Sequence, residues 1–409
     1  MSLKINHISI NNSIDSVPIA TIVNFKSNPQ SPDKVEISNK KKELSVGAKV
    51  GIGLGISAVI GLAIELICGK GKHLKSLWEK ITGKGGSKPP VKPNPDIVKS
   101  FKSIDEAKTY FENLGIKAIF KSGSENHLSD LNKIKNDLVL LEKNGVALTK
   151  PESIIISDWH NKEELKQIFT PLNINESQTE VCNKAADFWG TVARSNDNKY
   201  HVLINSSFGG DYGAFIHEMG HIHQDYLNSS FWHSKGLNGK EFMQKQMEVF
   251  GLAHIKLNPA LDTSSEYISS IFRYFTAFDE TSSPEIIQRC RRIFPNITAS
   301  DDNKVFCIND INGKTYYIDA KKMVDKMASE SGVYAPTKTW ENVAEIFQGL
   351  NRGKEYSDLV MLMYDINGGG RVPNLVIKGK KYDDYIESLY NNPDLIQKLR
   401  ECIEVKEFI

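Results

Sequence analysis

The sequence predicts an α+β fold for most of the chain. Helical and strand-like patterns alternate in mixed order, no internal repeat is present, and Asn312-Gly313 stands between two strand-like runs as a strong hairpin signal. With 409 residues, the chain is long enough for about two or three domains with a sizeable core. Hydrophobic residues make up 40% and charged residues 25%, which excludes disorder throughout the chain.

Charge and cysteine content exclude several classes of protein. Lys plus Arg number 51 and Asp plus Glu number 50, so the net charge of +1 shows no overall basic bias, and no nucleic-acid partner is expected. The five cysteines are odd in number and widely spaced, without a CxxC pair. We therefore expect neither a disulfide framework nor a cysteine-based zinc site.

The N-terminal part differs from the rest in composition. Residues 1–45 read as a flexible polar leader without the apolar run of a cleavable signal peptide. Residues 46–69 contain an apolar stretch from Val50 to Cys68, whose single charge is Glu65. As a helix this stretch is long enough to cross a bilayer once, and a glycine-rich buried segment of a soluble domain is the alternative.

A basic linker follows at 70–96. Its part 70–92 carries seven lysines against one acid, Glu79, which favours contact with anionic lipid headgroups. Glycines and prolines then indicate a flexible to semi-rigid connection. The sequence thus predicts a membrane partner through 50–68 and 70–92, followed by a globular domain over 97–409.

The globular part supplies the elements of the α+β prediction. Capping residues and apolar periodicity predict helices, and short alternating or apolar runs predict strands. The expected helices cover 103–114 and 128–143. The expected strands cover 116–120, 154–156, 200–206, 305–308 and 315–318, the last two joined by a type I′ turn.

The most informative segment is 213–226, GAFIHEMGHIHQDY, which contains an HExxH motif. On a helix, His217 and His221 project from one face, one turn apart, at a spacing that lets two imidazoles hold one Zn²⁺. Glu218 points elsewhere and is free to take a proton from water as a general base. The alternative is an ordinary amphipathic helix on which this spacing is a coincidence.

The surroundings of the motif favour a zinc hydrolase. The strand expected at 200–206 stands directly upstream, where an edge strand could pair with an extended peptide. His223 lies about 200° round the helix from His221 and is interpreted as a surface residue or as one that supports a ligand from behind.

A catalytic zinc needs a third protein ligand. The metzincin pattern is excluded because Gln224 and Leu227 stand where its glycine and histidine would be. The best candidate is a glutamate of 334–350, YAPTKTWENVAEIFQGL, where Glu341 and Glu345 share a helix face. Glu345 and Glu266 remain as alternatives to Glu341.

HEMGH followed by ExxAE, with a tyrosine seven residues before the first glutamate, resembles the gluzincin-type toxin metalloproteases related to anthrax lethal factor. The resemblance covers two short blocks, 213–226 and 334–347. It implies a zincin-like domain with an active-site helix and a small mixed sheet, one zinc ion held by His217, His221 and Glu341, Glu218 as the base and Tyr334 as oxyanion donor. The longer spacing between the blocks implies an insertion at about 231–331.

The function expected from this resemblance is zinc-dependent hydrolysis of peptide bonds in a protein substrate. Together with the leader, apolar stretch and basic linker, it predicts a bacterial virulence effector that is secreted into a host cell without a cleaved signal, associates with membranes there and acts on a host protein. Two alternatives stay open: a membrane-tethered binding or scaffolding protein with an inert HExxH, and a housekeeping bacterial membrane protease.

Overall fold

A computed structural model describes the part of the chain that carries the HExxH motif. The described residues are 99–120, 127–147, 150–174, 181, 189–197, 199–206, 213–225, 230–257, 276–277, 284–298, 301, 304–332 and 339–408. All belong to one compact unit, Lys92–Ile409. The predicted leader, apolar stretch and basic linker lie outside the described residues. Within the described ranges, no helix combines the length and the apolar character needed to cross a bilayer.

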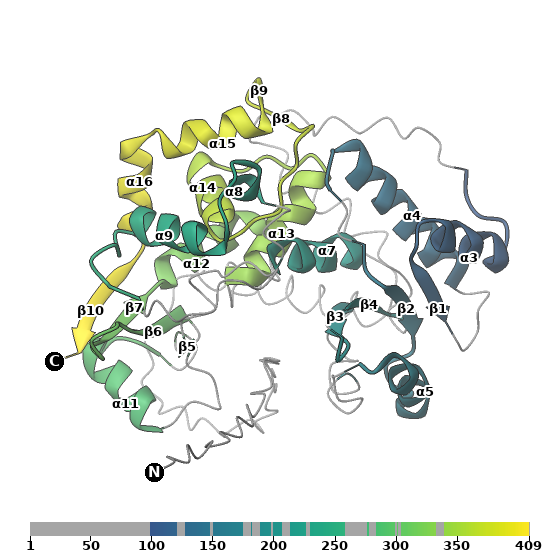
Figure 1. The fold of residues 1–409 in the computed structure, drawn as a ribbon, viewed down its shortest axis with the longest axis horizontal. Coiled ribbons are helices and arrows are strands. Elements are labelled where there is room, and N and C mark those ends of the chain that lie inside the picture. Colours follow the sequence, from purple (N-terminus) through teal and green to yellow (C-terminus); the bar gives the residue numbers. More distant parts are fainter. Residues whose placement is uncertain are drawn as a thin grey trace, which may run out of the picture. The chain divides into compact units, whose positions relative to one another are not determined.

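The unit is built from helices and small sheets, which confirms the α+β prediction (Figure 1). Its first elements are helix α3 (Ile104–Asn113), strand β1 (Lys117–Phe120) and helix α4 (Leu128–Lys143), close to the expected bounds. Ser103 caps α3 as its sequence position predicts, because its hydroxyl accepts a hydrogen bond from the backbone nitrogen of Glu106 at 3.2 Å.

The first sheet contains four strands in the order β1-β2-β4-β3. Strands β2 (Ser153–Ser157) and β4 (Tyr200–Asn205) are wholly buried and run parallel to β1, whereas β3 (Gly190–Arg194) runs antiparallel to β4 and forms one edge. The expected strand at 200–206 is confirmed, but its edge position is wrong. A strand with apolar residues on both faces belongs inside a sheet, and β3, three of whose five residues are only partly buried, takes the edge.

Helices cover both faces of this sheet. On one face, Ile155 and Leu203 pack against Trp159 and against α5 (Lys162–Leu172). On the other face, Ile154 and Val202 belong to the main core together with α3, α4 and α7 (Ala214–Asp225). The alternation of side chains along each strand therefore divides one sheet between two cores.

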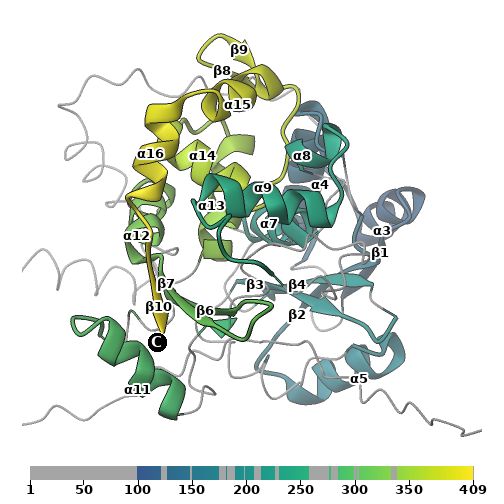
Figure 2. The same cartoon turned by 60° about the vertical axis from the view of Figure 1, so that its left-hand side comes forward.

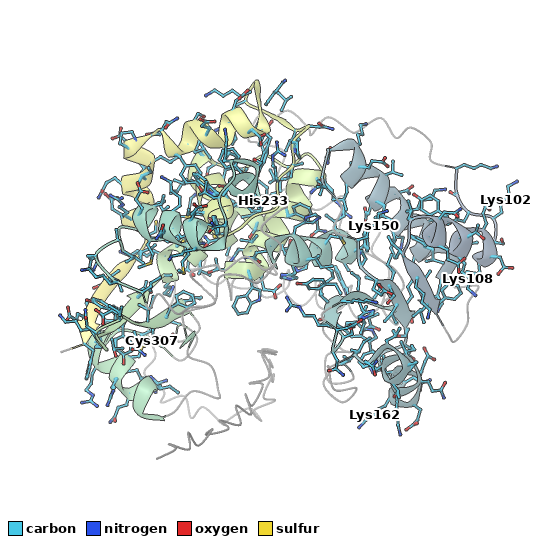
Figure 3. All side chains as sticks on the ribbon, in the orientation of Figure 1. Lys102, Lys108, Lys150, Lys162, His233 and Cys307 are labelled. Carbon is cyan, nitrogen blue, oxygen red and sulfur yellow. The ribbon has the colours of Figure 1, made fainter. Side chains whose placement is uncertain are left out.

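The second sheet is antiparallel, in the order β10-β7-β6-β5. Its strands are β5 (Thr276–Ala277), β6 (Val305–Asn309), β7 (Thr315–Asp319) and β10 (Glu404–Phe408). Helix α11 (Pro284–Ile293) packs on it through Cys290. Cys307 lies on β6 (Figure 3), and burial raises the pKa of its thiol to about 11. The three described cysteines, which include Cys402, are free thiols.

The β6–β7 hairpin is confirmed, but its predicted type I′ turn is wrong. The backbone nitrogen of Asp310 donates to Lys314 O at 2.9 Å, which leaves three residues in the loop, and only Gly313 among them has a positive φ, +78°. The Asp310 carboxylate accepts from the backbone nitrogens of Asn312 and Lys314, both at 2.8 Å. These bonds favour a three-residue loop that ends in a left-handed glycine over the two-residue turn.

The remaining helices pack around the main core. They are α8 (Phe231–Ser234), α9 (Gly239–Val249), α12 (Lys321–Ser331), α13 (Thr339–Asn351), α14 (Asp358–Ile366), α15 (Tyr382–Tyr390) and α16 (Pro393–Arg400), with a two-stranded hairpin of β8 (Val376–Ile377) and β9 (Lys380–Lys381). Figures 1 and 2 both show α7 and α13 side by side, although the sequence separates them widely. This helix pair positions the candidate site.

Candidate metal centre

Helix α7 carries the HExxH motif and is anchored by apolar residues. Phe215, Ile216, Met219 and Ile222 are all 0% exposed and lie within about 120° of one another on the helix, so one face of α7 is held by the core. The helix begins directly after Gly213, whose φ is +101° and where a Cβ would lie 2.1 Å from Nε2 of Gln348. Only glycine fits this entry, which fixes where the first turn of α7 starts.

A second glycine brings α13 against α7. A Cβ on Gly220 would lie 2.9 Å from the Cα of Ala344, so the two backbones approach more closely than any larger residue would allow. His217 and His221 flank this contact on α7, and Glu341 and Glu345 flank it on α13. The close approach therefore turns two separate i, i+4 pairs into one cluster of four side chains.

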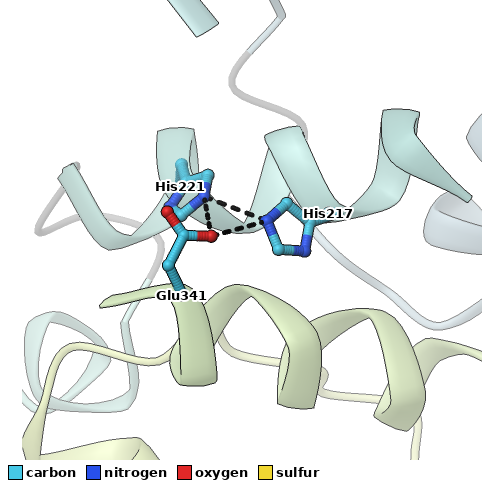
Figure 4. Close-up of side chains that lie close together, drawn as sticks. All are labelled: His217, His221 and Glu341. Carbon is cyan, nitrogen blue, oxygen red and sulfur yellow. Dashed lines mark hydrogen bonds and ion pairs between the residues drawn. The ribbon is translucent and has the colours of Figure 1, made fainter. Parts of the chain in front are cut away.

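Three of these side chains converge through single atoms (Figure 4). His217 Nε2 lies 3.1 Å from His221 Nε2 and 3.2 Å from Glu341 Oε2, and His221 Nε2 lies 3.5 Å from the same Oε2. Ligand atoms about 2.0 to 2.1 Å from a tetrahedral metal lie about 3.3 to 3.4 Å from one another. The triangle thus has the size that a small tetrahedral metal ion requires, and the group could hold such an ion.

Glu345 takes a different place in the cluster. Its Oε1 lies 3.1 Å from His217 Nδ1, the nitrogen opposite the one that faces His221 and Glu341. A carboxylate there accepts the Nδ1 proton, which leaves the Nε2 lone pair available for a metal. The structure thus groups Glu341 with the histidines and places Glu345 behind His217.

The charges of the cluster favour a bound cation. Burial lowers the pKa of His217, but hydrogen bonds to Glu341 and Glu345 outweigh it and hold this pKa well above its ordinary value. Burial raises the pKa of Glu341, yet the charge of His221 and the bonds to both histidines hold it well below the usual range. A proton on an imidazole and a bound metal ion would both be stabilised by the negative charge of the glutamates, so metal binding should displace protons from the cluster.

The cluster is partly open to solvent. The side chains of His217, His221 and Glu341 are 15%, 21% and 33% exposed, respectively. A metal held by three protein atoms at a partly exposed position retains room for water or a substrate oxygen.

Glu218 lies beside the triangle without joining it. It is 6% exposed and faces β3, because a Cβ on Gly190 would lie 3.1 Å from its Oε1 and 3.2 Å from its Cγ. The carboxylate therefore lies between the face of α7 that carries His217 and His221 and the edge strand of the first sheet. Tyr334 and Glu266, the predicted oxyanion donor and an alternative ligand, lie outside the described residues.

His223 corrects one interpretation. Instead of lying at the surface or behind a ligand, it is 0% exposed and packs on Phe347 of α13, with ring centroids 5.2 Å apart. Neither ring nitrogen has a hydrogen-bond partner among the described residues, and burial lowers its pKa to about 4. The face of α7 that carries His223 is covered by α13 and by Gly370. This face, which lies away from His217 and His221, therefore belongs to the core.

Sequence reasoning missed two neighbours of the site. Gly190 was not noticed, although a glycine at the start of an edge strand is a signal of close approach. Trp340 was not considered either, and its indole nitrogen donates a hydrogen bond to Glu341 Oε1 at 3.2 Å. Comparison of the chain with protein families, with curated proteins and with solved structures finds no match.

Proposed function

We propose that the protein is a zinc-dependent endopeptidase whose centre is His217, His221 and Glu341. The observation that carries the proposal is the triangle of two imidazole nitrogens and one carboxylate oxygen, 3.1 to 3.5 Å on each side. Two histidines and one glutamate, with a position left for water, are a ligand set of catalytic zinc. The resemblance to gluzincin-type toxin proteases and their zincin-like fold agrees with this set.

Zinc is the metal that best suits these ligands. Two neutral imidazoles and one carboxylate match its preference for nitrogen with oxygen, whereas Mg²⁺ and Ca²⁺ require mainly oxygen ligands. The triangle also has the edge length of a tetrahedron with zinc-ligand distances of about 2.0 to 2.1 Å. We therefore propose one zinc ion per chain.

The proposed reaction is hydrolysis of a peptide bond by water, without a covalent intermediate. The chemistry that zinc supplies in such a centre is Lewis-acid activation of water and of the substrate carbonyl. Glu218 takes the proton from water and delivers it to the leaving amine, a role that fits its place beside the triangle rather than within it. Tyr334, assigned from the resemblance alone, donates a hydrogen bond to the developing oxyanion.

The edge strand β3 supports a peptide as the substrate. In the described part of the chain β3 pairs with β4 alone, and directly after it Ser195 forms an isolated bridge with Ile174. We propose that the outer side of β3 near Gly190 receives an extended chain. β3 also contacts α7, and Gly190 brings its backbone next to Glu218. A peptide that added to this edge would place its backbone amides beside the proposed base.

The biological setting is proposed from the sequence. The polar leader, the stretch 50–68 and the basic segment 70–92 suit an effector that enters a host cell without a cleaved signal, associates with a membrane and cleaves a host protein. Expression of the full chain in recipient cells, followed by fractionation, tests this setting. Recovery of the protein in the membranes of the producing bacterium alone would favour the housekeeping protease.

The experiment that tests the activity measures zinc per chain by elemental analysis in the full-length parent and in alanine variants of the ligands. We expect one zinc in the parent and loss of zinc in His217→Ala, His221→Ala and Glu341→Ala. Glu218→Gln should retain zinc and lose peptide hydrolysis. A folded parent that takes up no zinc would make the HExxH inert and favour the binding or scaffolding protein.

A further inference from the structure

We infer that Trp340 is a positioning residue for Glu341, an inference that rests on the proposed zinc centre. The two oxygens of the Glu341 carboxylate have separate tasks. Oε2 lies 3.2 Å from His217 Nε2 and 3.5 Å from His221 Nε2, whereas Oε1 accepts a hydrogen bond from Trp340 Nε1 at 3.2 Å. Trp340 therefore holds the oxygen that does not face the metal position.

The geometry of this contact is unusual for neighbours in a chain. Successive residues of a helix point about 100° apart, so adjacent side chains do not normally meet. The indole must reach round the helix to meet the carboxylate. An indole has a single N–H and accepts no hydrogen bond, and among the described residues this N–H is donated to Oε1.

Glu341 needs such support because of where it stands. It lies in the first turn of α13, which begins at Thr339, and its side chain is 33% exposed. Within the described ranges, Trp340 is the only donor to Oε1. Without the indole, no described residue would donate a hydrogen bond to Oε1, and the carboxylate could rotate.

The consequence concerns how the carboxylate binds the metal. With Oε1 engaged by the indole, Glu341 would offer Oε2 alone to a metal and would act as a monodentate ligand. A released carboxylate could offer both oxygens and occupy the position that water needs. Partners of this kind typically change metal affinity about 10- to 100-fold when they are removed. For a neutral N–H donor we expect a change at the lower end of this range, a decrease in metal affinity of about tenfold.

The test uses the full-length chain with two substitutions of Trp340 and one control. Trp340→Phe keeps an aromatic ring without the N–H, and Trp340→Gln keeps an N–H donor without the ring. Trp232→Phe is the control, because it removes an indole whose N–H bonds Tyr390 at 3.2 Å instead of a metal ligand. Zinc affinity is measured by competition with a chromophoric chelator, and the Co²⁺ form is examined by visible absorption, whose intensity falls as the coordination number rises from four to five.

We expect Trp340→Phe to bind zinc about tenfold more weakly than the parent and its Co²⁺ band to weaken. Trp340→Gln should retain more affinity than Trp340→Phe, and the control should match the parent. Equal affinities and Co²⁺ spectra in parent and Trp340→Phe would overturn the positioning role while leaving the zinc centre intact, as would a Gln variant weaker than the Phe variant. A parent that binds neither metal would overturn the centre itself.

Discussion

Glu345 and His217 meet at the back of the candidate metal triangle, with Glu345 Oε1 3.1 Å from His217 Nδ1. The imidazole thus lies between two carboxylates, since its other nitrogen lies 3.2 Å from Glu341 Oε2. This contact orients the ring and favours a proton on Nδ1. Glu341 and Glu345, indistinguishable as partners of the histidines by spacing alone, have different tasks.

Removal of Glu345 should weaken zinc binding without abolishing it. Glu345→Ala leaves the Nδ1 proton of His217 without its acceptor, and we expect zinc affinity to fall about 10- to 100-fold. The measurement is competition with a chelator, with Glu355→Ala as a control because Glu355 is an exposed glutamate outside the cluster. Complete loss of zinc would make Glu345 a ligand, and unchanged affinity would remove it from the site.

A larger residue at Gly220 should separate α7 from α13. The Cβ of Gly220→Ala would lie 2.9 Å from the Cα of Ala344, so we expect the free energy of unfolding to fall by about 1–3 kcal/mol. Urea denaturation of the metal-free protein measures the change. Because the nearest atom belongs to the backbone, adding Ala344→Gly should recover little of it. Full recovery in the double variant would show that side-chain contact, not backbone approach, limits this interface.

A methyl group at Gly190 should disturb the base and spare the metal. In Gly190→Ala the added Cβ would lie 3.1 Å from Glu218 Oε1 and 3.1 Å from the Cβ of Ala214. Displacement of a catalytic group by about 1 Å can cost about 100-fold in rate, so kcat should fall while zinc content stays at the parent level. Thr191→Ala is the control, because the next residue of a strand faces the opposite side. Equal loss of activity in both variants would contradict the specific role of Gly190.

Stability should decrease with rising pH through the buried Asp365. Burial raises the pKa of this carboxyl to about 7, and Tyr390 donates to its Oδ2 at 2.7 Å. Because the folded-state pKa lies above the ordinary value of 3.8, the stabilisation is complete below about pH 4 and is lost as pH rises through about 7. Between pH 5 and 8 the loss should be about 2–3 kcal/mol.

Asp365→Asn provides the comparison for this pH dependence, because it keeps the shape and removes the titration. Urea denaturation in the presence of a chelator gives the free energy of unfolding at each pH. The difference between parent and variant should change by the predicted amount over this range. If the difference in free energy of unfolding between parent and variant stayed constant from pH 5 to 8, the pKa of Asp365 would lie outside this pH range.

Local patterns predicted the helices and most strands of the site, but not the contacts between them. The HExxH spacing located α7, and the glutamate pair located α13, because helical periodicity depends on a few neighbouring residues. The division of tasks between Glu341 and Glu345 depends on the approach at Gly220, which no local pattern contains. The edge position of β3 and the burial of His223 likewise depend on which elements enclose them.

His223 also shows which comparison a helical projection needs. At about 100° per residue, Phe215, Ile216, Met219 and Ile222 lie within about 120° of one another, and His223 falls inside this apolar face, about 20° from Ile216. A residue inside the apolar face of a helix is expected to be buried. Its angular position relative to the apolar residues was therefore a better guide to His223 than its position relative to the histidine pair.

The two halves of the candidate triangle lie 124 residues apart in sequence, between His217 and Glu341. In an unfolded chain the histidine pair has no third partner, so strong binding of a metal would begin only when α13 docks on α7. Metal binding and native structure would then be thermodynamically linked, each favouring the other. In the proposed hydrolase, a newly made or freshly unfolded chain would be inert, and its chemistry would start only on completion of folding.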